Sequence, residues 1–201
     1  MIETIAFDFG KVIGYFDHGR ALAKLAPHTP LSEQQMFAQI FGTDLEYQFE
    51  SGRISAAEFV RQLRSLCRLR CSEEQITAAV ADIFWPNDEL CALIPHLKKR
   101  YRLVLGSNTN AIHAPHYRAM FADTLKHFDT LIMSHEIGVC KPERAFYEKL
   151  ISVAGCPAER CVFVDDMPVN IEAANACGLR GIVYTRFDEL RTDLRNLGVA
   201  V

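Results

Sequence analysis

The sequence predicts an α/β protein in which a parallel sheet has helices on both faces and carries a small helical insertion. Two observations support this prediction. Beyond about residue 86, short apolar runs alternate with amphipathic stretches, which is typical of a parallel sheet covered by helices. Between residues 16 and 83 no strand-like run occurs, so this part is predicted to be an insertion after the first strand.

The first predicted strand is the apolar run from Ile2 to Phe7, which is rich in β-branched and aromatic residues. Asp8 follows this run directly, and Gly10 lets the backbone turn sharply or approach a ligand. Open α/β sheets bind ligands at the carboxyl ends of their strands, so Asp8 is a candidate functional carboxylate. The alternative interpretation is a turn residue, which is common for an Asp shortly before a Gly.

The predicted insertion consists of helices that begin with capping boxes, in which a serine is followed three residues later by Gln or Glu. This pattern occurs at Ser32, Ser55 and Ser72. Apolar residues follow Ser55 and Ser72 at helical spacing, and we expect these apolar faces to pack into a small bundle.

Four more strands are predicted, at residues 103–106, 130–133, 161–164 and 181–184. The expected organisation is a core of residues 1–15 and 86–201 with a helical cap of residues 16–85. The carboxyl ends of parallel strands share one edge of a sheet, so polar residues after these strands are expected to converge. These residues are Asp8, Ser107, Asn108, Lys141, Asp165 and Asp166.

Each of these polar residues also has an ordinary interpretation. Ser107 or Asn108 would serve as a helix cap, Asp166 would suit a helix start, and Lys141 would be solvated. Their convergence at one edge favours a functional site over these separate explanations.

Phosphoryl transfer through an aspartyl phosphate is the chemistry that suits this set. A carboxylate that attacks a phosphate dianion meets like-charge repulsion, so it needs Mg²⁺ and a fixed cation nearby. Asp8, a backbone carbonyl of Phe9 or Gly10, and Asp166 would supply the oxygen ligands that Mg²⁺ prefers.

The phosphate would need partners of its own. Lys141 would balance the charge of the nucleophile and of the phosphate. Ser107 and the Asn108 amide would hold the phosphoryl oxygens.

Four segments of the chain resemble motifs one to four of the haloacid dehalogenase superfamily. They are Phe7–Ile13 (FDFGKVI), Leu105–Asn110 (LGSNTN), Gly138–Pro142 (GVCKP) and Val162–Ile171 (VFVDDMPVNI). The resemblance covers essentially the whole chain, including a helical cap after motif one, and implies a Rossmann-like three-layer core. The most similar branch contains bacterial α-D-glucose-1-phosphate phosphatases and the phosphatase domain of bifunctional epoxide hydrolases.

This resemblance also implies a role for each matching residue. Asp8 corresponds to the nucleophile, while Ser107 and Lys141 correspond to the residues that serve the phosphate. Asp166 corresponds to the main side-chain metal ligand after Asp8, and Asp165 to an indirect or water-mediated ligand. The implied cofactor is Mg²⁺.

The chain departs from most phosphatases of the superfamily at one position. They carry an Asp as general acid and base two residues after the nucleophile, where this chain has Gly10. The most similar branch shows the same Asp-x-Gly pattern. Asp17 is the first candidate for a substitute acid, with a helix cap as its alternative role. His18, His113 and His116 are further candidates, and the last two would also suit a metal or a plain surface position.

The expected function is a Mg²⁺-dependent phosphatase for a small phosphorylated metabolite, with a sugar phosphate as the expected substrate. A 2-haloacid dehalogenase-type hydrolase is one alternative, although the adjacent carboxylates of Asp165 and Asp166 would repel Asp8 without a metal. A catalytically silent phosphate-binding module is the other alternative.

Composition narrows the range of partners. The net charge of −3 gives no general attraction to nucleic acid or to anionic membranes. The sequence has no run long enough to span a bilayer and no signal-like N-terminus. Seven scattered cysteines without a C-x-x-C pair favour a reduced, cytoplasmic protein, expected to be a monomer or a homodimer.

Overall fold

Five parallel strands form one sheet at the centre of the computed structural model, which describes residues 1–41 and 43–201. The strands lie in the order β5-β4-β1-β6-β7, so the first strand in the sequence is also the central one. Their bounds are Thr4–Phe7 (β1), Arg102–Ser107 (β4), Thr130–Met133 (β5), Cys161–Asp165 (β6) and Arg180–Val183 (β7). The α/β fold with a parallel sheet confirms the predicted fold class, and β7 begins one residue earlier than expected.

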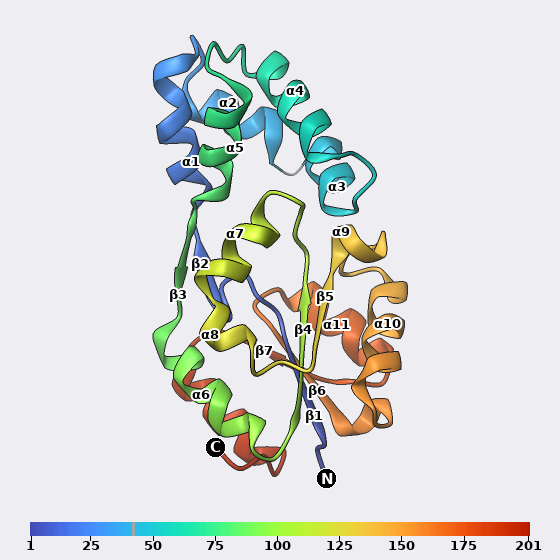
Figure 1. Cartoon of the computed structure of the whole chain (residues 1–201). Coiled ribbons are helices and arrows are strands. Elements are labelled where there is room, and N and C mark those ends of the chain that lie inside the picture. Colours follow the sequence, from blue (N-terminus) through green and yellow to red (C-terminus); the bar gives the residue numbers. More distant parts are fainter. Residues whose placement is uncertain (42) are drawn as a thin grey trace.

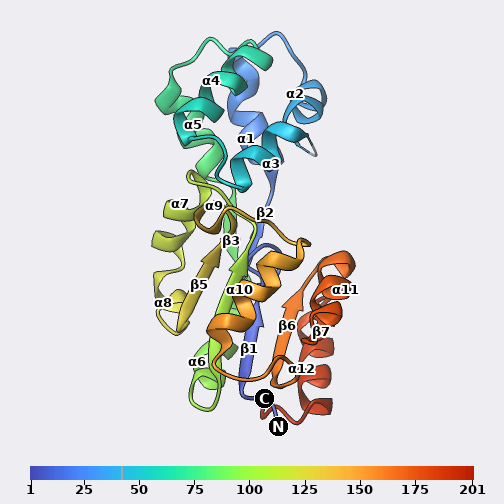
Figure 2. The same ribbon diagram turned by 90° about the vertical axis from the view of Figure 1, so that its right-hand side faces the viewer.

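The strand register brings the polar strand ends together. Phe7 pairs with Leu105 of β4 on one side and with Val164 of β6 on the other. Asp8 therefore follows β1 at the level of the residue that ends β6, Asp165. Figure 2 shows the strand arrows pointing toward one end of the molecule, where all these ends meet.

Helices cover both faces of the sheet. One face packs against α6 (Asp88–Lys98), α7 (His113–Met120), α8 (Ala122–Leu125) and α12 (Phe187–Asn196). The other face packs against α10 (Arg144–Ala154) and α11 (Pro168–Ala176). The short helix α9 (Ser134–Ile137) follows β5, and the 3-10 helix η2 (Ala158–Arg160) precedes β6. Another 3-10 helix, η1 (Ala26–His28), belongs to the helical part described below.

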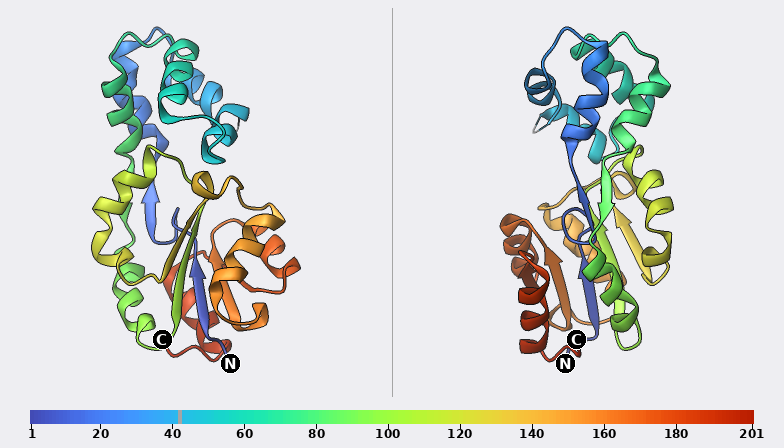
Figure 3. Two further views of the ribbon diagram at one scale, coloured as in Figure 1. Left: turned by 45° about the vertical axis from the view of Figure 1, so that its right-hand side comes forward. Right: turned by 90° about the vertical axis from the view of Figure 1, so that its left-hand side faces the viewer.

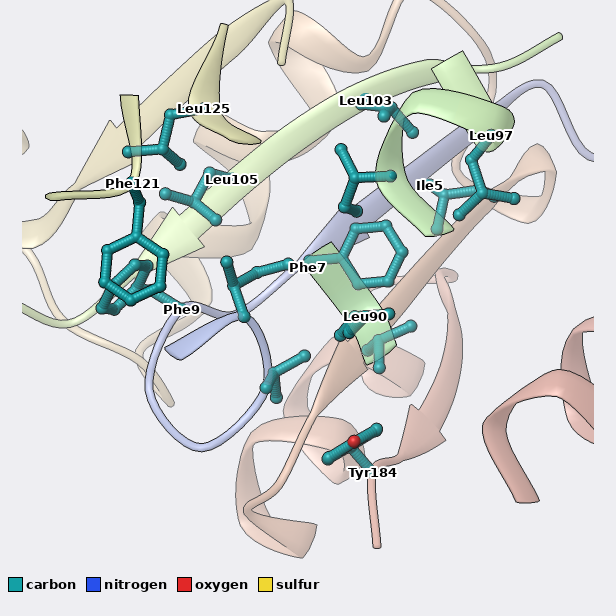
Figure 4. Packing of buried hydrophobic residues seen from close by; sticks show 14 of the residues in the cluster. Ile5, Phe7, Phe9, Leu90, Leu97, Leu103, Leu105, Phe121, Leu125 and Tyr184 are labelled. Atoms are coloured by element: carbon teal, nitrogen blue, oxygen red, sulfur yellow. The ribbon is translucent and has the colours of Figure 1, made fainter. Parts of the chain in front are cut away.

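Side chains alternate between the two faces because successive residues of a strand point to opposite sides. Ile5 and Phe7 of β1 belong to the larger cluster, whereas Ala6 between them belongs to the cluster under α10 and α11. Figure 4 shows Phe7 among the buried residues of the larger cluster, with Leu105 of β4 and Leu97 of α6.

A separate helical part lies beyond the carboxyl edge of the sheet, at the top of Figure 1. It contains α1 (His18–Leu25), α2 (Glu33–Ile40), α3 (Asp44–Glu50), α4 (Ala56–Leu66) and α5 (Glu73–Ala81), which are called the cap below. The cap has its own hydrophobic cluster, with Met36, Phe49, Phe59, Leu63 and Ile76 among its buried members. The expected small bundle is therefore present.

A two-stranded antiparallel ribbon connects the cap to the sheet domain, as Figure 3 shows. Its strands are β2 (Gly14–Phe16) and β3 (Phe84–Pro86), and Gly14 pairs with Pro86. The ribbon straddles both expected boundaries, after residues 15 and 85, so the division into core and cap stays a prediction.

The three predicted helix starts differ in detail. Ser32 and Ser72 form reciprocal capping boxes with Gln35 and Gln75. Ser55 accepts a hydrogen bond from the Glu58 backbone, but the Glu58 side chain pairs with Gln62 and Arg61 instead of returning to Ser55. The third box is thus only half formed. Within the described residues, no helix is both long enough and apolar enough to cross a membrane.

Candidate active site

Lys141 lies buried between two carboxylates at the carboxyl edge of the sheet. Its Nζ donates to Asp8 Oδ1 at 2.6 Å and to Asp165 Oδ2 at 2.7 Å, and its side chain is 1% exposed. Burial alone would lower the pKa of Lys141, but the two carboxylates hold it above its ordinary value. Lys141 is therefore a fixed cation within reach of Asp8.

Asn108 fixes the backbone that carries Lys141. Asn108 Oδ1 accepts from the Lys141 backbone N–H at 2.8 Å, and Asn108 Nδ2 donates to the Lys141 carbonyl at 3.0 Å. The sequence predicted that the Asn108 amide would hold phosphoryl oxygens. Much of its hydrogen-bonding capacity is instead used on Lys141, so its geometry supports a positioning role.

Asp8 is 7% exposed, and burial raises its pKa to about 7. Lys141 opposes this rise in pKa, while Asp165 and Asp166 add to it. The Asp8 backbone N–H donates to the Val164 carbonyl at 2.8 Å, which holds the residue against β6.

The loop after Asp8 leaves one backbone carbonyl suited to a metal. The Phe9 carbonyl accepts hydrogen bonds from Val12, Ile13 and Gly14 and is therefore occupied by the turn. Of the two carbonyls considered from the sequence, that of Gly10 is the better candidate ligand.

Asp165 and Asp166 are adjacent in the chain but have different surroundings. Asp165 is fully buried, and its Oδ1 accepts from the Met167 backbone and from Asn170 Nδ2, both at 2.9 Å. Its Oδ2 accepts a hydrogen bond from Lys141 Nζ and a second one from Asn170 Nδ2. Asp165 is thus already surrounded by protein donors.

Asp166 keeps its carboxylate available. Asp166 Oδ2 lies 3.7 Å from Lys11 Nζ, which is a long ion pair. Burial and the neighbouring Asp165 raise the pKa of Asp166. Carboxylate oxygens of Asp8, Asp165 and Asp166 lie within 4.8 Å of one another, and this all-oxygen donor set fits the preference of Mg²⁺.

A cavity of about 160 Å³ extends from this edge of the sheet into the cap. Gly10, Ser107 and Asn108 line its inner end. Ser107 is buried at the end of β4, and its place beside the phosphate stays a prediction.

Asp17 does not line this cavity. It is exposed and caps α1, since its Oδ1 accepts from the Gly19 backbone at 2.7 Å. Of its two roles proposed from the sequence, the structure supports the helix cap.

The three candidate histidines are placed differently. His18 and His113 line the cavity, and burial lowers the pKa of His18 to about 4 and that of His113 to about 3. Both are therefore neutral at pH 7. His116 does not line this cavity, and its Nε2 lies 3.9 Å from Asp82 Oδ1.

Glu50, the last residue of α3, is a candidate site residue that was not predicted from the sequence. Glu50 lines the cavity from the cap side, together with Glu46 one turn earlier. Burial is the main reason that its pKa rises to about 8, and Glu46 and Asp8 add to the rise while Lys141 opposes it. Its only signal in the sequence is a Glu beside Phe49 on a cap helix, which does not reveal what the side chain faces.

Comparison with known proteins identifies the family. The model of the haloacid dehalogenase-like hydrolases matches residues 2–178, and the chain belongs to this family, which confirms the resemblance of the four motifs. It is 27% identical to a D-ribitol-5-phosphate phosphatase of Bacteroides thetaiotaomicron, with 89% of each chain covered. It is 29% identical to a sesquiterpene phosphatase of Aspergillus oryzae, with 84% of this chain and 88% of that one covered.

A solved structure has the same fold. It is a haloacid dehalogenase family enzyme from Bacteroides thetaiotaomicron in complex with magnesium and inorganic phosphate. The TM-score is 0.79 at 24% identity, over 94% of this chain and 99% of that one.

Proposed function

We propose that this hydrolase is a Mg²⁺-dependent phosphatase that acts on a small phosphomonoester through an aspartyl phosphate on Asp8. The observation that carries the proposal is the Lys141 cation held between Asp8 and Asp165, with Asp166 left available beside them. The phosphatase names of two relatives support it. The magnesium and phosphate in the solved relative support the choice of cofactor.

The proposed reaction has two displacement steps. Asp8 attacks the phosphorus, the P–O bond to the alcohol breaks, and the alcohol leaves after taking a proton. Water then attacks the phosphorus of the aspartyl phosphate, which frees the Asp8 carboxylate and inorganic phosphate. Lys141 balances negative charge in both steps, and Ser107 donates to a phosphoryl oxygen.

Asp8, the Gly10 carbonyl and Asp166 would hold the metal, and Asp165 would support the site without direct ligation. Bound Mg²⁺ would neutralise charge on the phosphate and thereby reduce its repulsion of Asp8.

The two alternative functions remain distinct candidates. A dehalogenase mechanism would place Asp8 beside Asp165 and Asp166 without a divalent cation, and the raised pKa of Asp8 weighs against such a metal-free nucleophile. A silent phosphate-binding module would keep the same pocket without turnover.

The expected sugar-phosphate substrate has one supporting relative, named for D-ribitol 5-phosphate. The relative named for a sesquiterpene substrate points to an apolar alcohol instead. A reduced, cytoplasmic setting and a monomeric or homodimeric state stay proposals. The seven free cysteines are consistent with the reduced setting.

Hydrolysis of p-nitrophenyl phosphate tests the proposed function. We expect turnover that requires Mg²⁺, that stops with a chelator, and that falls by at least about a thousandfold in Asp8→Asn. An exposed-site variant, Asp123→Asn, serves as the matched control and should retain the wild-type rate. Phosphate binding without turnover would favour the silent module, and chloride release from 2-chloropropionate without added metal would favour the dehalogenase.

A further inference from the structure

The cavity lined by Gly10 and Ser107 has an outer end formed by apolar side chains from the core of the cap. Leu22, Leu25, Ile40, Phe59 and Leu63 line it and also belong to the hydrophobic cluster of the cap. The inner end, at Ser107 and Asn108, is polar. A phosphomonoester with its phosphate at the inner end would place its alcohol part against the apolar cap.

Some polar side chains on the walls of the cavity are engaged by other protein groups, whereas Thr109 Oγ1 and His113 Nε2 are buried without a hydrogen-bond partner among the described residues. Asn110 Oδ1 accepts from the backbone of Ile112 and of His113, while Asn110 Nδ2 lies 3.0 Å from His113 Nδ1. His18 stacks on Phe41 at 3.9 Å between ring centroids. At the apolar outer end, a hydroxyl of a sugar or polyol would lie against hydrocarbon side chains and lose its hydrogen bonds to water.

The size of the cavity limits the alcohol. Its volume is about 160 Å³, and an apolar protein cavity of about 150 Å³ accommodates benzene. Because the phosphate takes up part of this volume, the alcohol is limited to a compact hydrocarbon of no more than about six carbons, whether one aromatic ring or a short branched chain.

We infer that the substrate is a phosphomonoester of a compact apolar alcohol whose hydrocarbon part lies in the cap. This inference rests on the proposed phosphatase function and replaces the sugar phosphate expected from the sequence. Specificity then comes from burial of the apolar surface of the alcohol.

Substrate comparison tests this inference. With Mg²⁺ present, we expect kcat/KM for benzyl phosphate and 3-methylbutyl phosphate to exceed that for ribitol 5-phosphate and glucose 1-phosphate by at least about tenfold. A preference for the sugar or polyol phosphate would overturn the inference and leave the phosphatase function intact. If the wild-type protein hydrolysed none of these phosphates, nor acetyl phosphate, the proposed phosphatase function would be wrong, and the inference with it.

Two variants test whether the alcohol part of the substrate lies in the cavity. Ala21→Leu and Val80→Phe add bulk to the cavity wall from α1 and from α5. Each should lower kcat/KM for benzyl phosphate by at least about fivefold more than it lowers kcat/KM for acetyl phosphate, whose acetyl group is much smaller. Benzylphosphonate binding, followed by calorimetry, should weaken in parallel. Unchanged benzyl phosphate kinetics in both folded variants would contradict this location.

A second inference follows from a different observation, the placement of Glu50. Position 10 carries no acid, and Asp17 is exposed at a helix cap. Glu50 lines the same cavity as Gly10 and Ser107 from the opposite, cap side. The groups that influence or face it are Glu46 on its own helix, Lys141 and Asp8 from the sheet domain, and the Cys140 thiol.

We propose that Glu50 is the proton donor to the leaving alcohol. Its carboxylic acid gives a proton to the ester oxygen as the P–O bond breaks, and its carboxylate takes a proton from the attacking water in the second step. A neutral carboxylic acid suits an apolar cavity that must also admit a phosphate dianion, because an ionised Glu50 would repel the phosphate.

A leaving-group comparison tests this role. Glu50→Gln should lower the rate for benzyl phosphate by about a hundredfold to ten-thousandfold. The rate for p-nitrophenyl phosphate, whose leaving group needs no proton, should fall by less than about tenfold. The wild-type rate on benzyl phosphate should decline above about pH 8, and Glu50→Gln should lack this decline.

Glu33→Gln, at an exposed position on α2, is the matched control and should behave as wild type. Equal losses for both phosphates in Glu50→Gln would indicate a structural role, and an unchanged rate for benzyl phosphate would exclude Glu50 as the donor. Thermal melting of each variant separates these outcomes from unfolding.

Discussion

Phe16 fills the space beside Gly10: a Cβ added to Gly10 would lie 2.9 Å from Phe16 Cε1 and 3.9 Å from Asp8 Oδ2. The backbone conformation is not the obstacle to a side chain here, because the positive φ in this loop, 56°, belongs to Lys11. An aromatic ring therefore excludes an acid from the position where most phosphatases of the superfamily have one.

Gly10→Asp should destabilise the protein by about 1–3 kcal/mol, since the new side chain displaces the Phe16 ring. Phe16→Ala in the same chain should remove most of this penalty, with a coupling energy of at least about 1 kcal/mol in a double-mutant cycle. Urea denaturation of the two single variants and the double variant measures it. Additive effects would show that Phe16 does not occupy the space.

Replacing Asp166 should affect metal use more than replacing Asp165. Asp166→Asn removes a carboxylate that is available for ligation, so the half-saturating Mg²⁺ concentration should rise at least about tenfold. Asp165→Asn places an amide among groups that already donate to Asp165, so its main effect should be a loss of about 1–3 kcal/mol of stability. Mg²⁺ titrations of both the rate and the melting temperature distinguish these effects. A larger Mg²⁺ shift in Asp165→Asn would reverse the assignment.

Lys141→Met should be strongly destabilising because it leaves Asp8 and Asp165 buried without their shared cation. The expected loss is about 3–5 kcal/mol near pH 8. Lys126→Met is the matched control: Lys126 pairs with the exposed Asp123, and such surface pairs contribute little to stability. Adding Asp8→Asn to Lys141→Met should recover part of the loss. Equal stability of the two lysine variants would contradict this account.

The pH dependence of stability should reveal Glu50 in the metal-free protein. Its pKa is about 8 in the fold and 4.5 as the ordinary value, so the folded state binds more protons between these values. The Glu50 contribution to stability therefore falls as the pH rises from about 4.5 to about 8. Glu50→Gln should be more stable than wild type at about pH 8.5, by an amount on the order of 1–3 kcal/mol.

Denaturation of both proteins over this pH range measures the difference in stability between them. The two curves should converge below about pH 4.5, where Glu50 is protonated in both states. A constant difference at every pH would mean that the substitution acts through packing and not through the charge.

Strand periodicity made the sheet predictable, because β1 and β6 are short apolar runs with a carboxylate at or directly after their last residue. Parallel pairing then placed Asp8 and Asp165 at one edge, which Lys141 reaches from the segment between α9 and α10. The role of Asn108 was not predictable, because its hydrogen bonds reach a backbone that lies 33 positions away in the chain. Glu50 was missed for a similar reason: the fold of the cap determines what α3 faces, and local sequence does not encode it.

The antiparallel pairing of Gly14 with Pro86 and of Phe16 with Phe84 means that the chain leaves and rejoins the sheet domain at adjacent points. A segment of different length or fold could replace α1–α5 without altering a single strand connection of the sheet. Selection can therefore exchange the part that we propose recognises the alcohol while the residues at the carboxyl edge of the sheet stay unchanged. One ribbon of six residues thus makes substrate choice a transferable module.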